Sequence, residues 1–486
     1  MTIIPIILSG GEGKRLWPLS HPGKPKPLIK LPNGQTTLEM TLQRAAEISA
    51  TQQVCIITRE DLYSSHLEIL SLRSECQHTP HFILEPEARD TTAAIASAAL
   101  YWSGICNVDT LLCILPADHL IEDSSVLKAS INEAQQYAEN DQIVVFGVTP
   151  TSANPHYGYI HSEGSNVLAF TEKPTPLVAE TYLLNEDYYW NSGIILATAG
   201  TLLRALDATC PEILLACREG LDNAKHTTSL KVKCITLGHK AYGKIPKISF
   251  DHAVLEKVTN LSIVKCPMNW TDLGTWQAYE ELLSVDENGN RSHGEVHLHS
   301  SNRTAVIGSN KPITLIGVKD LVVVDGPSAI LIASKDSLEP LKKIADAFFE
   351  AKQANYTSET GITAASKLAA PTMIKKPWGS YEVLEKRAGY LVKRINVNPG
   401  KKLSLQSHFH RAEHWMIVAG KAIAINGADC VHLECNQTLS IERHAIHRLE
   451  NPGPDPLIII EIQFGDFLDE ADIVRYEDDF GRASGN

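Results

Sequence analysis

The stretch IIPIILSGGEGKRLWPLS, residues 3–20, decides the fold of the N-terminal part of the chain. It opens with an apolar, β-branched run at 3–8, which predicts a buried strand, and a glycine-rich loop at 9–15 follows directly. Without Cβ atoms, the backbone N–H groups of such a loop can close on phosphate oxygens, and the adjacent lysine and arginine add positive charge. The spacing fits neither the Walker P-loop nor the dinucleotide fingerprint. Taken alone, the loop is either a phosphate-binding loop or an ordinary strand-to-helix turn.

Short apolar runs alternate with longer amphipathic segments as far as residue 285. Thr36 and Glu39 have the spacing of a capping box at the start of a helix, and Asp90 is a candidate cap for a second helix. The alternation predicts an α/β domain over 1–285, with a Rossmann-like, mostly parallel sheet covered by helices on both faces. Ligands of such sheets bind at the carboxyl ends of the strands. We expect strands at 3–8, 53–58, 110–119 and 143–148.

The sequence changes character after this domain. Residues 286–355 predict a β-rich connector plus helix: short strand-like pieces between Gly, Asn, Asp and Ser indicate a small β-solenoid or meander, and helical periodicity follows at 337–355. Residues 356–372 are small and polar and are the best candidate for a linker. Residues 373–486 return to short strands and predict an all-β barrel or sandwich.

Length and charge limit the classes of function. The chain has 486 residues, which argues for about two to four domains. Lys and Arg number 44 against 57 Asp and Glu, a formal charge of −13, which speaks against a general binder of nucleic acid or anionic membranes. The ten cysteines contain no Cys-x-x-Cys pair and mostly lie in apolar runs, so free thiols and a cytoplasmic location are expected. No apolar run reaches the roughly 18–20 residues of a transmembrane helix, and we recognise no signal peptide.

A series of short motifs runs through the N-terminal domain. They are RLWPLS (15–20), PK (25–26), EP (85–86), ILPADH (114–119), FGVTPT (146–151), YGYI (157–160), EKP (172–174), WNSG (190–193) and WTDLGTW (270–276). In this order and spacing the domain resembles the sugar-nucleotide pyrophosphorylases, and specifically the long bifunctional mannose-1-phosphate guanylyltransferase/mannose-6-phosphate isomerases of type II. The loop departs from the family pattern at Lys14, where the family usually has Thr.

The resemblance implies a site for GTP and mannose 1-phosphate. It assigns Arg15 and Lys26 to the triphosphate and the departing pyrophosphate. It assigns Asp118 and Asp272 to Mg²⁺, a hard cation that prefers oxygen ligands, although either could be only a helix cap. These four residues are the implied catalytic set. The implied nucleotide-binding residues are Leu8, Gly10, Gly11, Gly13, Lys14, Arg15, Lys26, Glu85, Pro116 and Asp118. The implied sugar-phosphate-binding residues are Gly158, Glu172, Lys173, Asn191 and Asp272.

A second constellation lies in PGKKLSLQSHFHRAEHWMIVAG, residues 399–420. Gln406 and His408 are two residues apart, so on an extended strand both side chains point to the same side. Glu413 can reach the same point across a turn, and a downstream strand supplies His447. The spacing is similar to that of the two cupin motifs. Imidazoles with a carboxylate and an amide oxygen suit a divalent transition metal such as Zn²⁺, Co²⁺ or Mn²⁺, so we expect these four residues to hold one in a cupin barrel.

The C-terminal part also resembles phosphomannose isomerases in KPWGSYEVLE (376–385), VKRINVNPG (392–400) and EIQFGDFLDEADIVR (461–475). The resemblance implies that a base moves a proton between C1 and C2 of the sugar while the metal polarises the oxygens. His410 and Glu461 are both candidates for the base, and Arg475 and Arg482 are both candidates for holding the substrate phosphate. One departure from the family is His444, where Gly is usual.

These observations together predict an enzyme of GDP-mannose and polysaccharide biosynthesis with two activities. The first domain would make GDP-mannose and pyrophosphate from GTP and mannose 1-phosphate, and the cupin would interconvert mannose 6-phosphate and fructose 6-phosphate. Two alternatives stay open, a transferase whose cupin is only structural and a non-catalytic sensor of nucleotide sugars. The sequence is compatible with a homo-oligomer and does not define its size.

Overall fold

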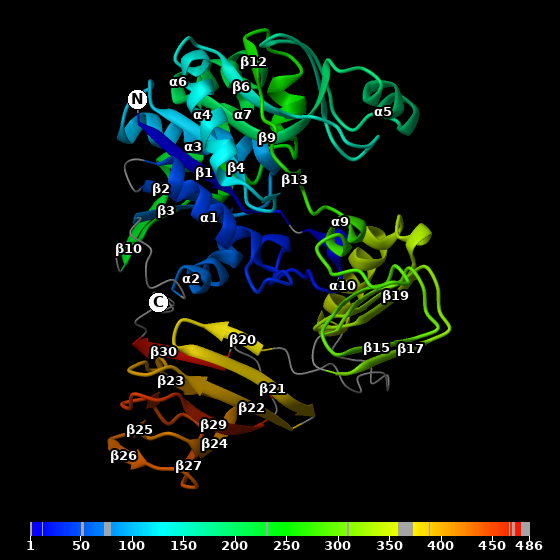
Figure 1. Cartoon of the computed structure of the whole chain (residues 1–486). Helices are drawn as coiled ribbons and strands as arrows, with labels where there is room; N and C mark the ends of the chain where they lie inside the picture. Colours follow the sequence, from blue (N-terminus) through cyan, green and yellow to red (C-terminus); the bar gives the residue numbers. More distant parts are fainter. Residues whose placement is uncertain are drawn as a thin grey trace. The chain divides into compact units, whose positions relative to one another are not determined.

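The computed structural model (Figure 1) describes residues 2–11, 13–49, 53–71, 79–229, 232–308, 311–357, 373–387, 389–465, 467–468 and 472–477. The chain divides into two compact units, Met1–Ser358 and Glu359–Asn486. The first unit holds an α/β sheet and a β-rich connector, and the second is an all-β barrel, which confirms the predicted fold class. None of the described helices combines the length and the hydropathy that crossing a membrane requires.

An eleven-stranded sheet forms the centre of the first unit. Its strands are β1 (Ile3–Leu8), β2 (Gln53–Arg59), β3 (Thr79–Glu85), β4 (Leu111–Pro116), β6 (Ile143–Val148), β7 (Tyr159–Glu163), β8 (Asn166–Thr171), β9 (Tyr188–Thr198), β10 (Lys225–Ser229), β11 (Val232–Thr236) and β12 (Leu261–Lys265). Parallel pairings join β11, β3, β2, β1 and β4, and also β6 and β12, as the alternating sequence predicts. The long strand β9 is antiparallel to β4 and to β6, and it joins the two parallel groups into one sheet.

Helices cover both faces of this sheet (Figure 1). They are α1 (Thr37–Ile48), α2 (Tyr63–Ser71), α3 (Asp90–Ile105), α4 (Ser124–Ala138), α5 (Pro176–Leu183), α6 (Ala199–Thr209), α7 (Pro211–Asp222) and α8 (His239–Tyr242). A further short helix, α9 (Trp276–Glu280), packs instead in a separate core with the connector. Side chains of β1 alternate between two cores, because successive residues of a strand point to opposite faces. Ile4 and Ile6 pack in the core beneath α3, α6 and α7, whereas Ile3 and Ile7 pack in the core beneath α1 and α4.

Two predicted helix starts can be compared with the structure. The capping box is confirmed: Thr36 accepts a hydrogen bond from the N–H of Glu39, and the Glu39 carboxylate accepts one from the N–H of Thr36. Asp90 is itself the first residue of α3 rather than a cap before it. It has φ +66°, a conformation that Asp tolerates better than most residues, and its carboxylate accepts the N–H of Thr91.

The connector winds as a solenoid. Its strands are β14 (Arg291–His293), β15 (Val296–His299), β16 (Ala305–Ile307), β17 (Ile313–Ile316), β18 (Leu321–Asp325) and β19 (Ile330–Ser334). The pairings β14–β16, β16–β18 and β15–β17 are parallel, which a meander cannot produce. Only the pairing of β18 with β19 is antiparallel within these described strands.

The connector packs directly against the glycine-rich loop. One continuous core contains Leu16 and Trp17 from the loop, Trp276 from α9, and Val322 and Leu341 from the connector. The indole N–H of Trp276 donates to the backbone oxygen of Trp17 at 3.2 Å. The loop that follows β1 is therefore supported from behind by residues about 300 positions later in the chain.

The helix of the connector, α10, spans Leu341–Thr357. It begins four residues after the predicted start at 337, because residues 335–337 form a short 3₁₀ turn instead. It also includes the first residues of the predicted linker at 356–372. Residues 358–372 lie outside the described part of the chain.

The second unit consists of a six-stranded and a five-stranded antiparallel sheet. The strands are β20 (Met373–Lys376), β21 (Gly379–Arg387), β22 (Tyr390–Val397), β23 (Leu405–His408), β24 (Arg411–Ala419), β25 (Ala422–Asn426), β26 (Asp429–Leu433), β27 (Thr438–Ile441), β28 (His447–Glu450), β29 (Leu457–Gly465) and β30 (Ile473–Glu477). Burial alternates along β24 and β29, so every second side chain points into the barrel. Glu413, Trp415, Glu461 and Gln463 are among these inward residues.

Candidate active sites

A cleft of about 700 Å³ opens at the carboxyl ends of β1 and β4 in the first unit. We call it the central cleft. It contains every residue that the sequence assigned to the transferase: Leu8, Gly10, Gly11, Gly13, Lys14, Arg15, Lys26, Glu85, Pro116, Asp118, Gly158, Glu172, Lys173, Asn191 and Asp272. The residues come from segments spread over more than 260 positions, so their gathering is a property of the fold.

Lys26 contacts two other segments of the central cleft. Its ammonium donates to the Asp118 carboxylate at 2.6 Å and to the backbone oxygen of Asp272. The Lys26 side chain is only 8% exposed, whereas the Asp118 side chain is 34% exposed, so the pair is shielded from water on the Lys26 side. Gly13 has φ +62° beside it, and a Cβ on Gly13 would collide with the Cβ of Lys26. Only glycine fits this close crossing of the two segments.

Two opposing effects act on the pKa of Asp118. Partial desolvation disfavours the charged carboxylate, but the Lys26 ammonium outweighs this and holds the pKa of Asp118 below its ordinary value. Burial lowers the pKa of the neighbouring His119 to about 4, so its imidazole is neutral near pH 7. His119 Nδ1 accepts the indole N–H of Trp270 at 3.2 Å, which leaves the proton on Nε2, 3.9 Å from Asp118. His119 thus supports an ionised Asp118 without adding a charge.

A buried carboxylate, Glu85, marks one end of the central cleft. The hydroxyl of Tyr242 donates to Glu85 Oε1 at 2.5 Å, and Oε2 lies close to Gly10. Burial raises the pKa of Glu85 to about 7, although the hydrogen bond from Tyr242 opposes this. The nearby Arg89 pairs with Glu87 at 2.6 Å. This end therefore offers hydrogen-bond acceptors in a dry, largely apolar wall.

Asn191 and a second carboxylate, Asp251, lie at the opposite end. Asn191 Nδ2 donates to Asp251 at 3.0 Å, and its Oδ1 accepts the N–H of Gly193 at 3.1 Å, so the amide is held in one orientation. Glu172 pairs with Lys173 and contacts Gly158, where a Cβ would approach its oxygen to 2.6 Å. Burial and the charge of Glu172 raise the pKa of Asp251 to about 6. Carboxylates, an amide and an ammonium together suit a hydroxylated, phosphorylated ligand.

The sequence did not assign a role to several residues of the cleft, among them Asp251, His119 and Tyr157. Asp251 begins a short π-helix (η4, Asp251–Leu255), and its position in FDHAVLEK gave no periodic signal. His119 is the last residue of the motif ILPADH (114–119), and the sequence assigned no separate role to this histidine. Tyr157 contacts Asp272 with its hydroxyl at 3.4 Å and packs against Trp270, with ring centroids 4.8 Å apart. The motif YGYI contained this tyrosine, but only the fold shows that it reaches Asp272.

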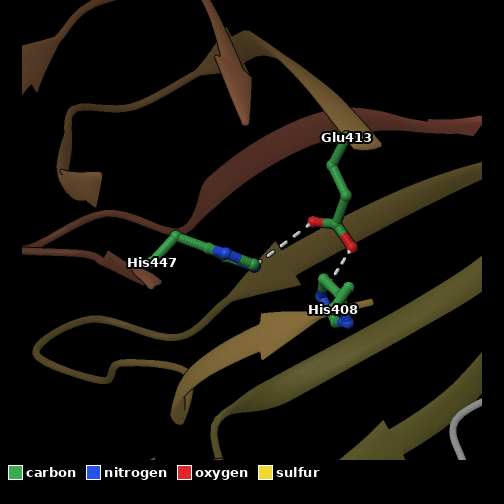
Figure 2. Close-up of side chains that lie close together, drawn as sticks. All are labelled: His408, Glu413 and His447. Atoms are coloured by element: carbon green, nitrogen blue, oxygen red, sulfur yellow. Dashed lines mark ion pairs between the residues drawn. The ribbon is translucent and has the colours of Figure 1, made fainter. Parts of the chain in front are cut away.

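The barrel contains a compact group of metal-type ligands. His408, Glu413 and His447 offer ligand atoms that all lie within 4.8 Å of one another, and all three side chains are buried. We call them the barrel cluster. Figure 2 shows the Glu413 carboxylate between the two imidazoles, with His408 Nε2 at 3.0 Å and His447 Nε2 at 3.7 Å. They come from the end of β23, from β24 and from β28.

The donor set of the barrel cluster fits a divalent metal. His447 Nδ1 donates to the backbone oxygen of Ala445 at 2.8 Å, which directs the lone pair of Nε2 toward the cluster. Buried His447 Nε2 and His408 Nδ1 have no hydrogen-bond partner among the described residues. Despite burial, the imidazoles and Arg411 hold the pKa of Glu413 well below its ordinary value. The predicted fourth ligand, Gln406, pairs with His447 across the sheet, and its Nε2 lies 3.5 Å from His408 Nε2.

The two candidate bases lie in different surroundings. Glu461 is buried inside the barrel, accepts a hydrogen bond from Gln463 at 2.8 Å and lies 3.7 Å from the Lys393 ammonium. Burial raises its pKa to about 7. The His410 side chain is 62% exposed, and its Nδ1 pairs with Asp472 at 2.7 Å. No contact among the described residues joins His410 to the barrel cluster.

The candidate phosphate ligands and the departure at residue 444 can also be placed. Arg475 pairs with Gln406 across the sheet, so both side chains lie on the same face of that sheet. Its buried Nε has no hydrogen-bond partner in the described part of the chain. Arg482 lies outside the described residues. His444 has φ +67°, so the turn does require the left-handed conformation for which the family uses Gly, and its ring packs on Phe409.

The comparison with known families agrees with this geometry. The nucleotidyl transferase family model matches residues 4–289. The chain belongs to this family. A family model described as a MannoseP isomerase/GMP-like β-helix domain matches residues 294–347, and a mannose-6-phosphate isomerase C-terminal model matches residues 363–478. The chain therefore joins a nucleotidyl transferase domain to an isomerase-type cupin.

Two relatives match this chain over nearly its whole length. The xanthan biosynthesis protein XanB of Xanthomonas campestris pv. campestris is 35% identical over 486 residues, with 99% of both chains covered. The mannose-1-phosphate guanylyltransferase of Escherichia coli is 34% identical, also with 99% of both chains covered. A solved structure from Thermus thermophilus, described as a mannose-1-phosphate geranyltransferase, has a TM-score of 0.62 and 27% identity and covers 72% of this chain and all of its own.

Removing a ligand of the barrel cluster tests the predicted metal site. We expect His447→Ala to weaken divalent metal binding at least about 100-fold, because one of few fixed donors is lost. His414→Ala is the matched control, since His414 lies on β24 and its Nδ1 bonds to Ser440 at 2.9 Å rather than to the cluster. Metal content after dialysis against Zn²⁺, Mn²⁺ or Co²⁺ is the measurement. Equal metal content in both variants and the parent protein would exclude the cluster as a metal site.

Proposed function

We propose that the central cleft transfers GMP from GTP to mannose 1-phosphate, giving GDP-mannose and pyrophosphate. The observation that carries this proposal is the convergence of Lys26, Asp118 and Asp272 at one point between a glycine-rich loop and a carboxylate-lined pocket. The guanylyltransferase among the relatives covers the full length of this chain, which supports the same substrates.

The chemistry explains why these residue types are needed. A phosphate oxygen of the sugar phosphate attacks the α-phosphorus of GTP, and the bond from that phosphorus to the β-phosphate oxygen breaks. The reaction brings several negative charges together, so the cleft must neutralise them. Lys26, Arg15 and the amides of the glycine-rich loop would do so for the triphosphate and for the pyrophosphate that leaves. Asp118 and Asp272 would hold Mg²⁺, which supplies further positive charge at the phosphates.

The two ends of the cleft suit the two substrates. Guanine carries two N–H donors on one edge, and the Glu85 carboxylate offers acceptors beside Gly10. Adenine lacks that pair of donors, so Glu85 would favour GTP over ATP. At the other end Asn191, Glu172 and Asp251 offer oriented hydrogen-bonding groups for sugar hydroxyls, and Lys173 adds a charge for the sugar phosphate.

We also propose that the barrel interconverts mannose 6-phosphate and fructose 6-phosphate. Support comes from the isomerase family match and from the barrel cluster. Gln406, His408, Glu413 and His447 would hold the divalent metal, which supplies positive charge to polarise the sugar oxygens. Glu461 is the better placed base, because it is buried beside Gln463 and that residue contacts Glu413 at 3.1 Å. It would take the proton from C2 of mannose 6-phosphate and return it to C1. Arg475 would hold the phosphate.

Pyrophosphate release tests the transferase directly. We expect the purified full-length protein to release pyrophosphate from GTP and mannose 1-phosphate with Mg²⁺, and to do so faster than from ATP, UTP or dTTP. Asp272→Asn should lower kcat about 100-fold, because a charge at the reacting phosphates is lost. The same variant should retain the isomerase rate, since Asp272 belongs to the other compact unit.

Three results would contradict parts of this assignment. Tight binding of GTP or GDP-mannose without any pyrophosphate release would instead indicate a nucleotide-sugar sensor. Preference for another nucleoside triphosphate would overturn the role given to Glu85. Equal loss of both activities in Asp272→Asn would mean that the two units do not work independently.

The isomerase can be tested by comparing its two candidate bases. We expect Glu461→Gln to lower the interconversion of mannose 6-phosphate and fructose 6-phosphate by about 100-fold or more, because a carboxylate that accepts the proton is lost at nearly constant shape. His410→Ala is the matched comparison and should change the rate by no more than about twofold. Coupled detection of fructose 6-phosphate measures both. The reverse order of effects would assign the base to His410, and no turnover in the parent protein would leave the cupin a structural module.

A further inference from the structure

Helix α10 of the connector reaches the central cleft. Leu341 and Ala345 on one side of the helix are buried in the core shared with the glycine-rich loop. Phe348 packs edge-on against Trp17, with ring centroids 5.2 Å apart. Lys342 lines the central cleft itself, together with residues of the loop. The connector therefore supplies part of the cleft wall.

An ion pair fixes the same helix to the loop. The ammonium of Lys14 lies 2.7 Å from the Asp346 carboxylate, and the two side chains are 27% and 35% exposed. Lys342 and Asp346 are four residues apart, so they lie on the same face of α10, about 6 Å apart along its axis. The face that holds Lys14 thus also presents Lys342 beside the loop.

The cations of this region differ in their pairing. Lys26 is neutralised by Asp118 and Lys14 by Asp346. Arg15 and Lys342 form no ion pair within the described residues, and Lys342 is exposed. Both side chains can therefore bind an anion without first giving up a carboxylate. A ligand with several negative charges would gain most from them.

The order of contacts along the loop places α10 relative to the substrate. Gly10 lies beside Glu85, the proposed base-binding residue, and Gly13 lies beside Lys26, which marks the reacting phosphate. Lys14, the next residue, contacts Asp346 of α10. Following the loop from the base end to the reacting end therefore leads to α10, where the outer phosphates of a triphosphate would lie.

We propose that α10 completes the triphosphate site, with Lys342 binding the outer phosphates that leave as pyrophosphate and Asp346 positioning Lys14 beside them. This proposal rests on the proposed transferase function and extends it to the connector. The ion pair between Lys14 and Asp346 ties the glycine-rich loop to α10. The connector is then a part of the catalytic unit rather than a spacer between two enzymes.

The decisive experiment compares two adjacent lysines of α10 in the full-length protein. Lys342→Ala should raise the KM for GTP about tenfold, because a charge-assisted contact to phosphate is lost. In the reverse reaction it should raise the KM for pyrophosphate by a similar factor and leave the KM for GDP-mannose unchanged, since GDP-mannose lacks the outer phosphates. Lys343→Ala is the control: Lys343 is exposed on the same helix but does not line the cleft.

The positioning role of Asp346 has its own readout. Asp346→Asn should raise the KM for GTP severalfold while the KM for mannose 1-phosphate stays constant, and Asp346→Glu should restore most of the loss. Adding Asp346→Asn to Lys14→Thr should have little further effect, because the two residues act as one pair. General damage to the fold would instead lower kcat and alter both KM values.

Several outcomes would overturn the proposal. Equal kinetics for Lys342→Ala and Lys343→Ala would remove Lys342 from the site, and a rise in the KM for GDP-mannose as large as that for pyrophosphate would place it elsewhere on the nucleotide. Additive effects of the Lys14 and Asp346 substitutions would refute the positioning role. A parent protein without pyrophosphate release would contradict the transferase function instead. In that case calorimetric binding of pyrophosphate to the parent, Lys342→Ala and Lys343→Ala proteins still decides the role of Lys342.

Discussion

The contact of the Lys26 ammonium with Asp118 and with the backbone of Asp272 is the constraint on which the central cleft depends. Asp118 lies 92 positions after Lys26 in the sequence and Asp272 lies 246 positions after it, so the contact joins three distant segments. Asp118 stays ionised in a partly dry site because this cation lies beside it. The glycine at position 13 is needed for the same reason, since any side chain there would push Lys26 away. The ion pair of Lys26 with Asp118, the close approach of Gly13 to Lys26 and the end of β4 thus form one structural unit.

This unit also explains how an acidic protein can handle strongly anionic substrates. The net charge of −13 speaks against a generally basic surface, but it does not describe the cleft, where the fold gathers loop amides and a few cations. Most of these cations are paired with carboxylates, which keeps them ordered. The solenoid and α10 hold the loop from behind through a shared core.

The sequence predicts the site best where one short motif gives both the type of a residue and its position at the end of a strand or loop. The motifs around Lys26, Asp118 and Asp272 carry both the residue type and its position at a strand or loop end, and the fold brings all of the residues assigned from them into one cleft. The sequence did not point to Asp251 or Lys342. Their positions in the cleft depend on the long-range packing of the π-helix η4 and of α10. Local patterns carry no information on such contacts.

In the barrel, the sequence predicts the metal-type ligands but does not decide between the two candidate bases. The spacing of His408, Glu413 and His447 resembles that of the two cupin motifs, and this resemblance predicted the cluster that the structure contains. Strand alternation alone places only Gln406 and His408 on one side. The choice between His410 and Glu461 is open in the sequence, because the outward face of LIIIEIQFG is apolar whereas its inward face carries the polar Glu461 and Gln463, the reverse of the usual pattern. In the structure Glu461 lies at an inward position and His410 pairs with Asp472. The roles of both residues in a reaction stay predictions.

The central claim, that Asp118 and Asp272 form the metal-assisted reaction centre now bridged by Lys26, can be tested by one diffraction measurement. Crystals grown with Mn²⁺ and a non-hydrolysable GTP analogue would be measured for anomalous scattering. The account predicts an anomalous peak within bonding distance of both carboxylates, with the Lys26 ammonium moved from Asp118 to a phosphate oxygen. An analogue bound in the cleft with no peak at these carboxylates, or with the contact between Lys26 and Asp118 unchanged, would contradict it.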